Sequence, residues 1–79
     1  MSYTNASTLY MTLISIPQPT EENQLRAFEY AARSKDIPIF LRLLALTNLS
    51  TSIEKEISKR SEAELLAVWA SKATRTTEE

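Results

Sequence analysis

Three amino acids are missing from this chain of 79 residues: it contains no glycine, no histidine and no cysteine. Phosphate-binding P-loops and dinucleotide-binding motifs need backbone that only glycine permits, so neither can be present. Without histidine and cysteine there is no imidazole base, no thiolate nucleophile and no zinc site of the usual nitrogen and sulfur type. The missing residues therefore exclude many folds and enzyme classes before any motif is considered.

Length and charge set further bounds on the chain. Its length allows one domain at most, and its hydrophobic fraction of 43% is that of a globular protein. A domain of this size buries only about 60–65% of its unfolded surface, and no disulfide supports it, so association with a second chain would help. The net charge of −1 gives no basic excess of the kind typical of nucleic-acid binders.

Nothing in the sequence indicates a targeting signal or a membrane span. Residues 1–16 lack the positive charge and the continuous apolar core of a signal peptide. The longest apolar run, Ile37–Leu46, contains Arg42 and is too short to cross a bilayer. We therefore expect a cytoplasmic protein with no membrane role.

The segment 8–16 fits two kinds of secondary structure. Apolar residues alternate with threonine and tyrosine through its first half, as in a strand, but Leu9, Leu13 and Ile16 also fall on one helical face. The threonine and isoleucine content slightly favours the strand. Pro17 ends the segment in either case, because residues before proline avoid the helical conformation.

The first clear helix begins at Thr20, a good N-cap, which is followed by two glutamates that the helix N-terminus favours. Apolar residues repeat with helical spacing through Leu25, Phe28 and Ala32. The helix should stop near Ser34–Lys35.

A second helix is expected to start at Asp36, which supplies an acceptor, with Pro38 in its first turn. It continues to Leu46 and is apolar on almost every side, with Arg42 as its only charge. Asn48 is the expected left-handed residue at its end, in the place that glycine would usually take.

Two capping boxes follow, Thr51–Glu54 and Ser61–Glu64, each with a hydroxyl residue three positions before a glutamate. They predict two helices, about 51–59 and 62–74. One long helix is the alternative, because no glycine or proline separates the two and their apolar residues stay in helical phase.

These elements predict a mainly α fold, a small bundle of three or four helices in a single domain (residues 1–79), with an N-terminal strand as an open alternative. The polar ends, residues 1–7 and 75–79, are expected to be flexible tails. The apolar helix 38–46 is expected to be the central element, with apolar residues of the other helices packed around it.

The sequence offers little to support catalysis. Most carboxylates lie at helix starts or beside arginine and lysine, where caps and solvated ion pairs explain them. Serine and threonine are abundant but have no histidine to activate them, and no calcium-binding loop is present. We therefore expect a non-enzymatic protein without a cofactor, a metal or a small-molecule substrate.

The best basic cluster is formed by Lys55, Lys59 and Arg60, but Glu54 and Glu56 lie among these residues and cancel much of their field. A solvated helix face is the simplest interpretation. The functional alternative is phosphate contact by a DNA-binding protein, in which Arg42 would contribute as well.

Two DNA-binding arrangements fit the order of the elements. A strand at 8–16 followed by helices at 20–34 and 36–46 resembles the ribbon-helix-helix family, which implies that the strand enters the major groove. This strand has no Arg, Lys, Asn or Gln, and no glycine separates the helices. A helix-turn-helix would use 38–47 as its reading helix, where only Arg42 suits base edges.

The preferred function is that of a small helical regulator or adaptor that acts through protein contact and associates with itself. A helix that is apolar on every side needs cover from all directions, and short neighbours would leave part of it for a partner. Tryptophan is enriched at such contacts. The predicted partner interface consists of Ile39, Phe40, Leu43, Leu44 and Trp69.

Overall fold

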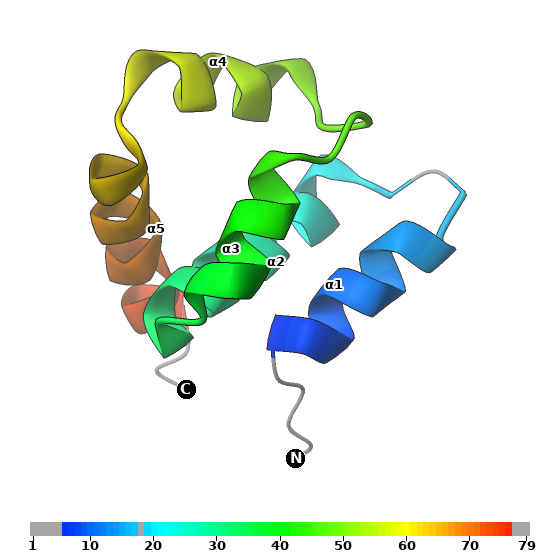
Figure 1. The fold of residues 1–79 in the computed structure, drawn as a ribbon, viewed down its shortest axis with the longest axis horizontal. Helices are drawn as coiled ribbons and strands as arrows, with labels where there is room; N and C mark the ends of the chain where they lie inside the picture. Colours follow the sequence, from blue (N-terminus) through cyan, green and yellow to red (C-terminus); the bar gives the residue numbers. More distant parts are fainter. Residues whose placement is uncertain (1–5, 18, 77–79) are drawn as a thin grey trace.

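The computed structural model describes residues 6–17 and 19–76, and the side chains of residues 8–17 and 19–72. This part of the chain forms five helices and no strand, which confirms the mainly α class and adds a helix to the predicted three or four. Figure 1 shows α4 lying across one end of the molecule, with α1 and α5 on opposite sides of α2 and α3. The helices are α1 (Ala6–Ser15), α2 (Glu21–Ser34), α3 (Ile37–Leu44), α4 (Thr51–Lys59) and α5 (Glu62–Thr76).

The predicted tails lie mostly outside the described residues. Of the N-terminal tail, residues 6–7 are described and are helical, and of the C-terminal tail the same holds for residues 75–76. The flexibility of the two tails stays a prediction.

The helix α1 occupies the segment where a strand was slightly favoured, so the strand prediction was wrong. Leu13 is buried in the core. Leu9, one helical turn before it, packs against the same core, as residues on one helical face do. Thr12 and Ser15 donate their hydroxyl hydrogens to carbonyls one turn back in the same helix, at 2.9 and 2.8 Å. The ribbon-helix-helix arrangement therefore lacks its strand.

The helix α2, rather than α3, is the central element of the fold. It packs against α1, α3 and α5, and in Figure 1 it lies behind α3. Its buried side includes Ala27, Ala31 and Ala32, whose small side chains let neighbouring helices approach closely. The prediction that the helix 38–46 would be central was wrong, because it gave no weight to the packing that these alanines permit.

The turn between α2 and α3 is held by caps on both sides. At the far end of α2, its start, Thr20 is the N-cap as predicted, since its hydroxyl accepts a hydrogen bond from the backbone N–H of Asn23 at 3.1 Å. The helix ends at Lys35, which has left-handed backbone angles (φ 59°, ψ 35°). Asp36 then caps α3, and its carboxylate accepts from the N–H of Ile39 at 3.3 Å.

Lys35 occupies a conformation that glycine adopts without strain, so replacing Lys35 by glycine is expected to stabilise the fold by about 0.5–1 kcal/mol. Glycine at the preceding Ser34, which is exposed and helical, should instead destabilise by a similar amount, because it loses more backbone freedom on folding. Urea denaturation of the two variants measures both changes. If both variants were stabilised, or both destabilised, the left-handed conformation of Lys35 would be contradicted.

The helix α3 ends at Leu44, two residues before the predicted end, and Asn48 does not cap it. Among the described residues, Lys35 alone has a positive φ, so the left-handed prediction for Asn48 was wrong. The segment after α3 is held by Gln24 of α2, whose side-chain amide donates to the Asn48 carbonyl and accepts from the Ser50 N–H, both at 2.9 Å. This clamp fixes where α4 begins.

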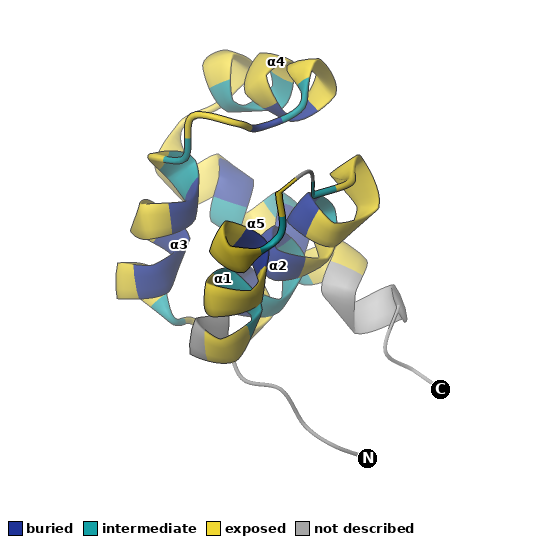
Figure 2. Cartoon of the chain, turned by 90° about the vertical axis from the view of Figure 1, so that its right-hand side faces the viewer, coloured by how far each residue is buried: buried dark blue, intermediate teal, exposed yellow. Residues whose placement is uncertain are grey.

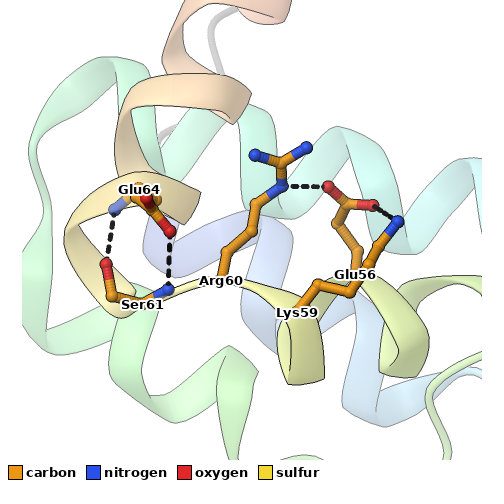
Figure 3. Close-up of polar contacts among 5 residues, drawn as sticks. All are labelled: Glu56, Lys59, Arg60, Ser61 and Glu64. Atoms are coloured by element: carbon orange, nitrogen blue, oxygen red, sulfur yellow. Dashed lines mark hydrogen bonds and ion pairs between the residues drawn. The ribbon is translucent and has the colours of Figure 1, made fainter.

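The two predicted capping boxes have different outcomes. The N-cap of α4 is Ser50 rather than Thr51, since the Ser50 hydroxyl accepts from the N–H of Ile53 at 3.2 Å. The second box is confirmed: Ser61 accepts from the Glu64 N–H at 3.2 Å, and Glu64 accepts from the Ser61 N–H at 3.1 Å (Figure 3). With Arg60 in an extended conformation, the region forms two helices and not one.

Because the Ser61 box opens α5, replacing Ser61 by alanine is expected to destabilise the fold by about 1 kcal/mol. Ser58 provides a matched control, since its hydroxyl bonds to the Glu54 carbonyl within α4 and caps nothing. Alanine at Ser58 should be neutral or slightly stabilising, because alanine has the higher helix propensity. Thermal or urea denaturation of both variants is the measurement, and a neutral Ser61→Ala would argue against the cap.

Candidate functional site

The predicted partner interface lies in the core rather than on the surface. Four of its five side chains are buried, and only Leu44 is half-exposed. Phe40 packs edge-on against Phe28 and Trp69, with ring centroids 5.7 and 6.0 Å away, and the centroids of Phe28 and Trp69 are 4.4 Å apart. The interface assignment is therefore corrected, because these side chains are covered by the chain's own helices. The four buried residues are Ile39, Phe40, Leu43 and Trp69.

Four other large apolar side chains remain exposed among the described residues, and they lie on α1 and α3. Met11 and Ile14 are 55% and 50% exposed on α1, and Ile37 and Leu41 are 40% and 43% exposed on α3. The two helices contact each other, and both carry exposed residues on their outer sides (Figure 2). Exposed apolar side chains that gather on neighbouring elements are typical of contact surfaces.

The exposed side of α1 is free of charge. Residues 1–20 contain no Asp, Glu, Lys or Arg, so all the charged side chains lie between residues 21 and 79. Each of the other four helices exposes at least one charged side chain. We call this exposed, uncharged side the α1 face. It consists of Thr8, Met11, Thr12, Ile14 and Ser15.

Two hydroxyl groups of the α1 face are already bonded within the helix. The hydroxyls of Thr12 and Ser15 are bonded to the carbonyls of Thr8 and Met11. A hydroxyl that is bonded in this way loses little when water is removed from it, whereas an unbonded one would be costly to bury. Covering the α1 face therefore costs little at the hydroxyls of Thr12 and Ser15.

A shallow apolar hollow of about 430 Å³ lies where α2, α3 and α5 meet. Small side chains form most of its wall, and Lys35 is the single charged residue. It borders the exposed Ile37, so the apolar surface of α3 continues toward α5. Its lining residues are Ala32, Lys35, Ile37, Ala63, Leu66, Ala67 and Ala70.

A second hollow of about 220 Å³ between α2, α4 and α5 is more polar. The hydrogen bond from Arg60 holds the pKa of Glu56 below its usual value, so this carboxylate stays ionised and is a poor proton donor. Ser52 is the only hydroxyl residue of the lining. The lining residues are Glu21, Leu25, Ser52, Ile53, Glu56, Trp69 and Lys72.

Glu29 is the carboxyl with the clearest effect of burial. It is half-buried on α2, and desolvation raises its pKa, against the opposing influence of Lys72 and Arg26. A carboxyl group with a raised pKa is a candidate functional group when it lies in a cleft that could bind a substrate. Glu29 lines neither of the two hollows described above.

The cations proposed for DNA contact are exposed and belong to two different parts of the chain. Arg42 is on α3, whereas Lys55, Lys59 and Arg60 belong to α4 and its end. Figure 3 shows that Glu56 binds two of them: Arg60 through a hydrogen bond and Lys59 at 3.8 Å. This shared carboxylate reduces the positive field that phosphate contact would need.

Two further observations concern metals and membranes. No group of three or more potential ligands is placed to hold a metal ion within the described residues. None of the helices that the structure describes combines the length and apolar character that a bilayer crossing requires.

Sequence reasoning missed the residues that the structure exposes. Met11 and Ile14 were assigned to an ambiguous segment, and the side of the apolar helix left for a partner was assigned to other residues than Leu41. The signal that could have found the α1 face is the absence of charge from residues 1–20, since a solvent-exposed helix usually carries charged side chains.

Comparison with known proteins gives no relative: no family model matches this chain, and neither a curated protein nor a solved structure is significantly similar to it.

Proposed function

We propose that this chain is a small, non-enzymatic helical regulator or adaptor that works through contact with protein. The observation that carries the proposal is the α1 face, an exposed helix surface with Met11 and Ile14 and no charged residue. The centres of protein interfaces are depleted in charge and enriched in methionine and aromatic residues. We expect it to act in the cytoplasm, an expectation that comes from the sequence alone.

The outer side of α3 supports the same proposal. Ile37 and Leu41 are exposed one turn apart, and Ile37 borders the apolar hollow between α2, α3 and α5. A chain this small needs most of its large apolar side chains for its core. Large apolar side chains that stay exposed on two adjacent helices therefore support a contact with another molecule.

No observation favours the DNA-binding alternative. Lys59 and Arg60 share one carboxylate, and a reading helix at α3 would present Arg42 beside the apolar Ile37 and Leu41. Strong retention on heparin that is lost with added salt would restore this alternative, because phosphate contact is strongly salt-dependent.

Photo-crosslinking in the cells that produce the protein tests the proposal. A photoreactive amino acid at Met11 should yield crosslinks to protein, because the α1 face is expected to be covered. The same amino acid at Lys55, exposed on the charged helix α4, is the control and should yield few. Absence of crosslinks at Met11, or equal yields at the two positions, would contradict the proposal.

A further inference from the structure

We propose that the α1 face is the contact between two copies of this chain, which pair through antiparallel α1 helices about a two-fold axis. This inference rests on the proposed function and names its partner. It concerns the α1 face alone, and not the buried residues that sequence reasoning assigned to self-association.

The charge distribution points to a second copy. In a two-fold contact the same patch meets itself, so a charged residue near the axis faces an identical charge and repels it. The α1 face has no such residue, whereas α2, α3, α4 and α5 each expose charged side chains that a two-fold contact would bring together. A different protein would usually find complementary charges to recognise, and the α1 face offers none.

The side chains of the α1 face also suit close helix pairing. Thr8, Met11 and Ser15 follow each other along its middle at intervals of three and four residues. Small hydroxyl residues on either side of a methionine leave room for helices to approach to roughly 8–10 Å, the usual separation of packed helices. The hydroxyls of Thr12 and Ser15 keep their internal hydrogen bonds in such a contact.

The geometry sets both the register and the strength of the pairing. Met11 lies beside the midpoint of α1 (Ala6–Ser15), so an antiparallel pair places it next to its counterpart. A ten-residue helix is about 15 Å long and offers less area than the roughly 1,200–2,000 Å² of a standard interface. The dissociation constant is therefore expected in the micromolar to sub-millimolar range.

Analytical ultracentrifugation from low micromolar to millimolar concentration tests this pairing, with Met11→Glu and Met11→Lys as variants. The unmodified chain should reach a dimer, and each variant alone should stay monomeric because two like charges meet at the axis. An equimolar mixture of the two variants should recover the dimer, because opposite charges then meet. Circular dichroism establishes that both variants remain folded.

Lys55→Glu is the matched control, since Lys55 is an exposed residue of α4, outside the α1 face and outside the apolar side of α3. It should dimerise as the unmodified chain does. A monomer at millimolar concentration, a dimer that survives Met11→Glu, or a mixture that fails to recover would each overturn the inference. If the chain is monomeric but Met11 crosslinks to a different protein, the second-copy inference is wrong and the proposed function stands. If Met11 crosslinks to nothing, both are wrong.

Discussion

Replacing Phe40 by aspartate is expected to unfold the chain, whereas the same replacement at the adjacent Leu41 should leave it folded. Phe40 is 0% exposed between the rings of Phe28 and Trp69, while Leu41 is 43% exposed. An ionised carboxylate buried without a partner costs several kcal/mol, in addition to the lost ring contacts. Small domains have only about 5–15 kcal/mol of stability in total. Far-UV circular dichroism and Trp69 fluorescence measure the outcome.

Phe40→Leu serves as the conservative control, since it keeps the site apolar and should lower the stability without abolishing the fold. Phe40→Asp also tests the interface that the sequence indicated. A Phe40→Asp chain that kept its helical spectrum and lost only self-association would return the interface to the residues that the sequence indicated.

Local signals in the sequence predicted most helix starts. Thr20, Asp36 and Ser61 cap helices as expected, because each offers a side-chain acceptor to backbone N–H groups that the helix itself leaves free. At the start of α4 two adjacent residues, Ser50 and Thr51, could both act. Gln24, distant in the sequence, holds the Ser50 N–H and so selects Ser50, which no local pattern could show.

The N-terminal segment shows the limit of periodicity. Its apolar residues fit a strand and a helix equally, so the choice depends on what covers them. Leu13 reaches the core and Met11 does not, which is possible because the two lie on different sides of a helix. In a strand, residues two apart point to the same face, and Met11 and Leu13 would have been buried together.

The exposed side of α3 was missed for a related reason. A helix that is apolar on every side gives no internal indication of which side the fold covers. Ile39, Phe40 and Leu43 of α3 face inward and Ile37 and Leu41 face outward. That division depends on the close packing around α2, which comes from long-range contacts rather than from the α3 sequence. The sequence could therefore predict that part of α3 is exposed, but not which of its residues form the exposed side.

Replacing Gln24 by glutamate is expected to make the stability of the fold strongly dependent on pH. Gln24 is 2% exposed, and its amide donates to the Asn48 carbonyl while its side-chain oxygen accepts from the Ser50 N–H. An ionised carboxylate can accept but cannot donate, so it would face the Asn48 carbonyl oxygen without a hydrogen bond. Burial and this contact raise the folded-state pKa of the introduced carboxyl above its unfolded value of about 4.3.

A raised folded-state pKa determines the direction in which the stability of Gln24→Glu changes with pH. The stabilising contribution of the introduced carboxyl is fully present below the unfolded pKa, where its O–H replaces the amide as a donor to Asn48. It is lost as the pH rises through the folded-state pKa. Relative to the unmodified chain, Gln24→Glu should therefore be nearly neutral in acid and destabilised by roughly 3 kcal/mol near neutral pH.

Gln24→Leu is the control that separates the loss of the hydrogen bonds from the burial of a charge, because it removes both hydrogen bonds at every pH and introduces no charge. It should destabilise by about 2–3 kcal/mol, since a backbone donor and an acceptor lose their partner, and the difference from the unmodified chain should not depend on pH. Urea denaturation of the three proteins at several pH values gives the result. If Gln24→Glu is as stable as the unmodified chain near neutral pH, then Gln24 does not hold the segment between α3 and α4, and the start of α4 at Ser50 needs another cause.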